Sequence, residues 1–178
     1  MLTDRLELRP TEERDRQRFV ELFCDEAFMV FSGGVHDLAS AHVRFDEMVL
    51  RSEELSFAKQ PIIERETDTI VGYSGVNWFD FEGERRLEFG WRLVPDARGK
   101  GYATEAGLAV LELAHESFRG EILAMIDPTN QPSANVARKL GFEFWKQAVV
   151  DDWLDDLYRI DVGGSSSTTA PGSKPSRA

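Results

Sequence analysis

The chain reads Arg98-Gly99-Lys100-Gly101-Tyr102-Ala103-Thr104 between a predicted strand, residues 86–94, and a predicted helix that starts near Gly101. Glycines allow the backbone to approach a ligand closely. Unpaired N–H groups at the start of a helix, together with the helix dipole, attract phosphate groups. Arg98 and Lys100 add positive charge. The stretch therefore predicts a cradle for a pyrophosphate, and the alternative is an ordinary turn that contains two glycines.

Two common nucleotide-binding motifs do not fit this loop. A P-loop has Ser or Thr directly after its lysine, whereas Lys100 is followed by Gly101. A dinucleotide-binding fingerprint has a third small residue after its two glycines, and Thr104 occupies that position. That fingerprint also belongs to a parallel sheet, which the pattern of strands in this chain does not predict.

The segment after the loop has the pattern of a helix that packs against a sheet. Its apolar residues recur at intervals of one, three and four, and they are Ala103, Ala106, Gly107, Val110, Leu111, Ala114 and Phe118. Glu105, in the first turn, is expected to satisfy the helix dipole. The pattern then predicts a strand over 122–126, a short helix over 132–140 that ends at Gly141, and strands over 142–150 and 153–162.

The segment before the loop predicts a strand, two helices and three more strands. Leu6 and Leu8 alternate with charged residues, as in a short strand. The remaining elements are predicted as helices around 19–23 and over 37–51, and as antiparallel strands over 57–64, 70–79 and 86–94. The complete order is typical of an α+β fold with a mostly antiparallel sheet.

Length and composition fit one globular domain, which we place at residues 1–162 of the 178-residue chain. Residues 163–178 contain no aliphatic or aromatic residue except alanine, and they predict a disordered tail. Cys24 is the only cysteine, which excludes an internal disulfide and favours a reducing cytoplasm. Three scattered histidines predict no metal site. No apolar run approaches the roughly 18 residues of a membrane span.

The net charge of the chain restricts the kinds of molecule that it is expected to bind. The chain carries 21 basic and 32 acidic residues, a net charge of −11, and residues 1–162 hold 19 of the basic residues and all of the acidic ones. A domain this acidic repels the phosphates of nucleic acids. Its field favours a cationic partner, and the alternative is that the acidity serves solubility alone.

The glycine loop also matches a second pattern, Arg/Gln-x-x-Gly-x-Gly/Ala, through Arg98, Gly101 and Ala103. Three other segments accompany it in a fixed order: TDRLELRP at 3–10, LEFGW at 87–91 and NQPSANVARKLGF at 130–142. Over residues 3–160 the chain resembles the GCN5-related N-acetyltransferases, known as the GNAT superfamily. Within it, the chain resembles the branch of the ribosomal-protein N-terminal acetyltransferases.

The resemblance implies a three-layer α+β fold, in which a twisted, mostly antiparallel mixed sheet of six to seven strands has helices on both faces. It places acetyl-CoA in a cleft between two splayed parallel strands, about 86–94 and 121–127. The backbone of 99–104 would bind the pyrophosphate, and the first of these strands would pair with the pantetheine amides. The cofactor-binding residues it implies are Phe89, Trp91, Leu93, Arg98, Gly99, Lys100, Gly101, Tyr102, Ala103, Thr104, Asn130, Arg138 and Lys139.

Two residues are candidates for catalysis. Many relatives have a tyrosine as general acid where this chain has Ala137, so we expect Ser133 to hydrogen-bond the departing thiolate instead. The alternative is that Ser133 caps the helix that follows. Glu88 lies on the strand that borders the implied cleft, and we expect it to take the amine proton through a water. Its alternative is a surface glutamate paired with Arg86 or Arg92.

The resemblance implies transfer of an acetyl group from acetyl-CoA to a primary amine by direct attack in a ternary complex, without a metal. The acceptor would be a protein N-terminal α-amine, for instance of a cationic peptide, or a small-molecule amine. The loops at 30–55 and 150–157 are expected to select it. The missing tyrosine leaves a second interpretation, a non-catalytic acyl-CoA-binding module or sensor. We expect a cytoplasmic monomer or homodimer that binds neither nucleic acid nor membrane.

Overall fold

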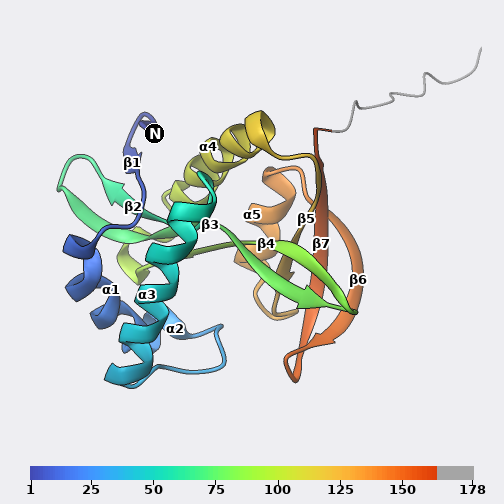
Figure 1. Cartoon of the computed structure of the whole chain (residues 1–178), viewed down its shortest axis with the longest axis horizontal. Coiled ribbons are helices and arrows are strands. Elements are labelled where there is room, and N and C mark those ends of the chain that lie inside the picture. Colours follow the sequence, from blue (N-terminus) through green and yellow to red (C-terminus); the bar gives the residue numbers. More distant parts are fainter. Residues whose placement is uncertain (164–178) are drawn as a thin grey trace, which may run out of the picture.

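The structure is a computed structural model that describes residues 1–163. The predicted tail at 163–178, apart from Gly163, lies outside the described residues. The elements, in chain order, are β1 (Leu6–Leu8), the 3-10 turn η1 (Glu13–Asp15), α1 (Arg16–Phe23), α2 (Glu26–Met29), α3 (Leu38–Glu54), β2 (Gln60–Glu64), β3 (Thr69–Phe81), β4 (Glu84–Leu93), the 3-10 turn η2 (Pro95–Ala97), α4 (Tyr102–Ser117), β5 (Gly120–Ile126), α5 (Gln131–Lys139), β6 (Glu143–Val150) and β7 (Trp153–Val162) (Figure 1).

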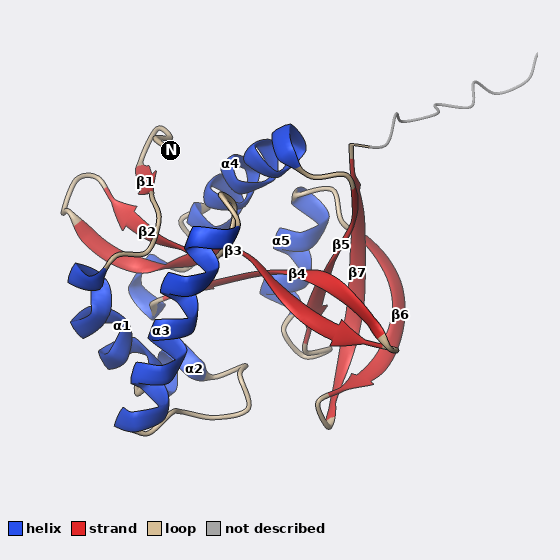
Figure 2. Cartoon of the chain, in the orientation of Figure 1, coloured by secondary structure: helices blue, strands red, loops and turns tan. Residues whose placement is uncertain are grey.

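The described strands form one seven-stranded sheet in the order β1-β2-β3-β4-β5-β7-β6. Neighbours pair antiparallel except β4 and β5, which are parallel. Helices α4 and α5 pack on one face of the sheet, and α1 and α3 pack on the other. Figure 2 shows the strands running between these two groups of helices. The three-layer α+β fold with a mixed, mostly antiparallel sheet is therefore confirmed.

Strand β4 shows how the sequence pattern sorts residues between the two faces. Leu87, Phe89 and Leu93 are buried in the same core as α4. Successive side chains of a strand point to opposite faces, so Glu88 and Gly90 face the α1 and α3 side. The alternation read from the sequence thus placed the charged residues of this strand away from the main core.

Helix α4 can lie close to its neighbours because four residues of its buried stripe, Ala103, Ala106, Gly107 and Ala114, are small. Ala103, Ala106 and Ala114 are all buried against the sheet. A Cβ atom at Gly107 would lie 2.7 Å from Cδ1 of Leu140, so any larger residue here would displace the Leu140 side chain at the end of α5. Burial of this stripe adds to the hydrophobic stabilisation of this side of the sheet.

Some boundaries differ from those expected. The helix predicted over 37–51 runs to Glu54, and the strand predicted from 57 begins at Gln60. The short helix α2 was not predicted, since its four residues are too few to show helical periodicity. Its N-cap is Asp25, whose side chain accepts a hydrogen bond from the backbone N–H of Phe28 at 2.6 Å.

Candidate active site

Strands β4 and β5 diverge shortly after they meet. They pair only at Leu87–Ile122 and Glu88–Leu123 within the described residues. Beyond this point β4 continues along β3 to Leu93, while β5 continues along β7 to Ile126. Beyond Glu88, the edge of β4 therefore faces no neighbouring strand within residues 1–163. It faces a wedge-shaped opening between the diverging strands β4 and β5, called the wedge below. This is the splayed pair of parallel strands that the family resemblance implied.

The glycine loop lies at the open end of this wedge, between β4 and α4. Gly99 and Gly101 have φ values of +74° and +85°, which favour glycine. A Cβ atom at Gly99 would meet nothing within 4 Å, and one at Gly101 would meet only Nη2 of Arg5 at 3.4 Å. The N-terminus of α4 has no side-chain cap. Its first turn thus offers backbone N–H groups beside an open loop, which fits a pyrophosphate.

The two cations of the loop are held by the protein itself. Nε of Arg98 donates to the carbonyl of Leu93 at 3.0 Å, and its Nη2 donates to the carbonyl of Ala27 at 2.6 Å. Nζ of Lys100 lies 3.9 Å from Oε1 of Glu64. Arg98 therefore links the loop to the end of β4 and to α2. It also supplies the positive charge that we expected from it.

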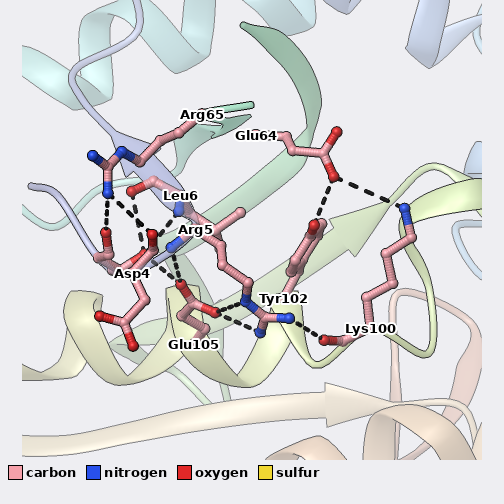
Figure 3. A network of polar contacts seen from close by, with 9 residues as sticks. Asp4, Arg5, Leu6, Glu64, Arg65, Lys100, Tyr102 and Glu105 are labelled. Carbon is pink, nitrogen blue, oxygen red and sulfur yellow. Dashed lines mark hydrogen bonds and ion pairs between the residues drawn. The ribbon is translucent and has the colours of Figure 1, made fainter. Parts of the chain in front are cut away.

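Glu105 joins the N-terminal segment to the start of α4 (Figure 3). Its carboxylate accepts hydrogen bonds from Oγ1 of Thr3 at 2.6 Å and from the backbone N–H, Nε and Nη2 of Arg5 at 2.6–2.9 Å. Nη1 of Arg5 donates to the carbonyl of Lys100 at 2.8 Å, within the glycine loop. The expected role of Glu105, limited to the helix dipole, was incomplete, because the residue also braces the loop from behind.

These contacts change the pKa of Glu105. Burial raises the pKa of this carboxyl, and the hydrogen bonds from Thr3 and Arg5 lower it further than burial raises it. The carboxylate is thus held in its charged form. Next to it, the hydroxyl of Tyr102 donates to Oε1 of Glu64 at 2.6 Å, and this bond lowers the pKa of Glu64.

Glu88 lies at the closed end of the wedge, where β4 and β5 last pair. Its Oε2 accepts a hydrogen bond from Nζ of Lys59 at 2.7 Å, and the two side chains are only 14% and 15% exposed. The alternative of a surface glutamate paired with Arg86 or Arg92 is wrong. Arg86 pairs with Glu84 and Glu121 instead, while Nη1 of Arg92 lies 3.0 Å from Sδ of Met29.

Ser133 and Asn130 lie at the start of α5, which follows β5. The cap of this helix is Asn130, whose Oδ1 accepts from the backbone N–H of Ser133 at 3.2 Å. The alternative that Ser133 is the cap is therefore wrong, and its hydroxyl makes no hydrogen bond within residues 1–163. Ala137, at the position of the tyrosine of relatives, is fully buried.

The other residues that we expected to bind the cofactor lie on β4 and α5, and they differ in burial and in hydrogen bonding. Phe89 and Leu93 are buried and Trp91 packs against the same core, so these three residues offer their backbone to the wedge. Arg138 donates to Oδ1 of Asn135 at 3.0 Å and to the hydroxyl of Tyr158 at 3.2 Å. Lys139 is exposed at the end of α5.

Two charged residues near Glu88 were missed by sequence reasoning. Lys59 precedes β2, and no local pattern links it to a strand 29 residues later. Asp155 lies on β7, and burial, followed by the charges of Asp127, Asp156 and Glu88, raises its pKa to about 6. The run of acidic residues at 151–156 is the signal in the sequence that could have identified Asp155.

Comparison with known proteins identifies the family. Residues 5–143 match the model of the acetyltransferase (GNAT) domain. The chain belongs to the GNAT acetyltransferase family. It is 30% identical over 163 residues to YnaD, an uncharacterized N-acetyltransferase of Bacillus subtilis, which covers 88% of this chain and 92% of that protein. Membership assigns to this GNAT protein acetyl-CoA-dependent acetyl transfer, and the wedge and the glycine loop fit that co-substrate.

Solved structures of GNAT proteins share the fold. An acetyltransferase of Agrobacterium tumefaciens is 28% identical, with a TM-score of 0.77, and the match covers 90% of this chain and 92% of that one. A ribosomal-protein-S5-alanine acetyltransferase of Vibrio fischeri has a TM-score of 0.74 over 92% and 97% of the two chains, but only 17% identity. At that identity the likeness concerns the fold, so the resemblance to the ribosomal-protein branch remains an expectation.

Residues 1–163 contain neither a membrane-spanning helix nor a metal-binding cluster. None of their helices combines the length and apolarity needed to cross a membrane. No group of three His, Cys, Asp or Glu side chains among them is arranged to hold a metal ion.

Proposed function

We propose that this acetyltransferase transfers the acetyl group to a primary amine by direct attack in a ternary complex, with Glu88 as the base. The observation that carries the proposal is the position of Glu88 at the closed end of the wedge between β4 and β5. A pyrophosphate held by residues 99–104 would direct the pantetheine arm along the free edge of β4. The thioester would then lie near the last paired residues, beside Glu88.

The reaction requires a neutral amine nitrogen. An α-amine with a pKa near 8 is roughly one-tenth neutral at pH 7, whereas a lysine-type amine near 10.4 is far less so. The nitrogen lone pair forms the new N–C bond, and the C–S bond breaks with its electron pair going to sulfur. The excess proton of the amine passes to Glu88, directly or through a water. The hydroxyl of Ser133 would donate a hydrogen bond to the departing thiolate.

The acceptor would approach from the face of α1 and α3, since Glu88 points to that face. Two segments expected to select the acceptor meet there. A Cβ atom at Gly33, in the loop between α2 and α3, would lie 3.6 Å from the ring of Trp153, at the start of β7. The acceptor is a protein N-terminal α-amine or a small-molecule amine, and the acidic domain attracts the ammonium form of either.

Thiol release from acetyl-CoA, followed across a panel of amines and peptides, tests this function. Glu88→Gln should lower turnover by roughly a factor of 10² with little change in acetyl-CoA affinity. Glu143→Gln, at an exposed residue at the start of β6, is the matched control and should behave like the parent. Tight acetyl-CoA binding without thiol release for any acceptor would instead favour a non-catalytic acyl-CoA-binding module, which the replacement of the tyrosine by Ala137 also allows.

A further inference from the structure

A hollow lies beside Glu88, between α1, α3 and β3. Its walls are formed by Phe23, Arg44, Glu47, Met48, Arg51, Lys59, Tyr73, Val76 and Asn77. Asn77 is the register partner of Glu88 on the adjacent strand, so the two side chains lie on the same face of the sheet. Lys59 both lines the hollow and contacts Glu88. The hollow is thus adjacent to the proposed base.

Three cations, Arg44, Arg51 and Lys59, line the hollow together with one carboxylate, Glu47, although the chain as a whole is acidic. Nζ of Lys59 lies 5.7 Å from the ring centroid of Tyr73, and Cζ of Arg92 lies 5.9 Å from it. Burial raises the pKa of the Tyr73 hydroxyl, but nearby cations lower it further than burial raises it. These cations are Arg92, Lys59 and Arg44. At Tyr73 these three charges together outweigh burial and the charge of Glu88, which both raise its pKa.

Arg44 differs from the other two cations that line the hollow. Lys59 is paired with Glu88, and Arg51 is paired with Glu54 at 2.8 Å. Arg44 makes no ion pair or hydrogen bond within residues 1–163, and its guanidinium lies over the ring of Phe23 at 5.3 Å. It is half-buried on α3. A guanidinium in such a wall has donors available for a carboxylate or a phosphate.

The opposite side of Glu88 carries a second carboxylate, Asp155, on the same strand as Arg159, which pairs with Glu121. Leu123, the register partner of Glu88, shares a hydrophobic cluster with Leu157, so β7 presents Leu157 on the same face. Asp155, two residues earlier on β7, points to that face as well. The wedge therefore has cations on its β3 side and two carboxylates, Glu88 and Asp155, towards its β7 side.

We infer that the acceptor amine also carries an anionic oxyacid group, which Arg44 binds in the hollow while the amine faces Glu88. The inference rests on the proposed function. Lys59 contacts Oε2 of Glu88, so Oε1 remains for the acceptor ammonium. The acceptor class is a small amino acid-like zwitterion, and the group on Arg44 is a carboxylate or a phosphate-type anion. The acidic surface attracts the ammonium end, and Arg44 orients the other end.

The test compares matched acceptors on parent and variant enzymes. The acceptors are 4-aminobutanoate, its uncharged amide and 3-aminopropylphosphonate, each assayed by thiol release with saturating acetyl-CoA. Because intrinsic amine reactivity is the same for every enzyme, the acid-to-amide ratio of kcat/KM isolates the effect of the protein. In Arg44→Met this ratio should fall by about tenfold to a hundredfold, the size expected for one charge-assisted hydrogen bond. Arg44→Lys should retain part of the preference.

Arg14→Met is the control, since Arg14 is exposed and pairs with Glu12 away from the hollow. It should leave the ratio unchanged. Comparison of the acid with the phosphonate identifies the anion that Arg44 prefers. An unchanged ratio in a folded Arg44→Met protein, or a parent that prefers the amide, would overturn the inference.

The proposed function can fail separately, if the parent releases no thiol with any amine. Calorimetry of 4-aminobutanoate and 3-aminopropylphosphonate with the CoA-saturated parent then decides the inference alone. Binding that Arg44→Met abolishes supports the anion site. No binding at millimolar concentration overturns it.

Discussion

Gly90 lies directly beneath the carboxylate of Glu88: a Cβ atom at Gly90 would be 2.6 Å from Oε1 of Glu88 and 3.2 Å from Nζ of Lys59. The φ angle of Gly90 is not positive, so the glycine is needed for space and not for backbone conformation. The segment LEFGW at 87–91 thus combines a candidate base with the small residue that allows the carboxylate to lie against the strand.

Gly90→Ala should therefore impair turnover without preventing acetyl-CoA binding. The added methyl group displaces the Glu88 carboxylate, and a misplacement near 1 Å can lower a rate by about 10². We expect kcat to fall about tenfold to a hundredfold. In a Glu88→Gln background the same change should add little, because the two residues act through one contact. Equal fold losses in both backgrounds would separate Gly90 from Glu88.

The glycine loop gives a prediction on cofactor affinity. Gly101→Asp should abolish acetyl-CoA binding, because it places a negative charge at the N-terminus of α4 where a phosphate must lie. Gly101→Asn is the control of equal size, since asparagine also tolerates a positive φ. Calorimetry should show much weaker binding for the aspartate variant than for the asparagine variant. Similar affinities for both would mean that phosphate does not approach Gly101.

Glu105 gives a prediction on the pH dependence of stability. At pH 7, Glu105→Gln should lower the free energy of unfolding by about 1–3 kcal/mol, because Arg5 loses a charged partner. The folded-state pKa of Glu105 lies below the ordinary value of 4.5. Its stabilisation is therefore complete above that value and is lost as the pH falls through the folded-state pKa.

Urea titrations of parent and variant between about pH 7 and pH 3 measure this effect. The difference in unfolding free energy should shrink towards the acidic end. Glu112→Gln, at an exposed residue of the same helix, should show no such trend. A difference that stays constant with pH would mean that the charge of Glu105 is not what joins Thr3 and Arg5 to α4.

The parts of the fold that the sequence predicted are those governed by local periodicity. The apolar stripe of α4 and the alternation of apolar and polar residues in β4 could be recognised directly in the sequence, because each pattern marks one buried face. The divergence of β4 and β5 came from the family resemblance, because strand pairing depends on contacts between distant segments. The four residues of α2 were missed because their pattern is too short.

The candidate site was predictable only in part, for a similar reason. Glu88 and the glycine loop could be recognised from the residues next to them in the sequence. The Lys59–Glu88 pair and the position of Arg44 beside the hollow arise only when α3, β2 and β4 come together. At α5, Asn130 and Ser133 are both good capping residues, and the starting residue of the helix decides between them.

Because Asn130 and not Ser133 caps α5, the roles of the two residues can be separated by experiment. Asn130 accepts the capping hydrogen bond, so Asn130→Ala should lower the free energy of unfolding by about 1 kcal/mol. Ser133→Ala removes a hydroxyl that makes no hydrogen bond within residues 1–163, so stability should change by less than about 0.5 kcal/mol. Turnover should show the opposite order if Ser133 assists the departing thiolate. Ser133→Ala should then lower kcat by roughly 10² while acetyl-CoA affinity is kept. A Ser133→Ala protein that loses stability but keeps its kcat would instead assign the hydroxyl to the helix and leave thiolate departure to water.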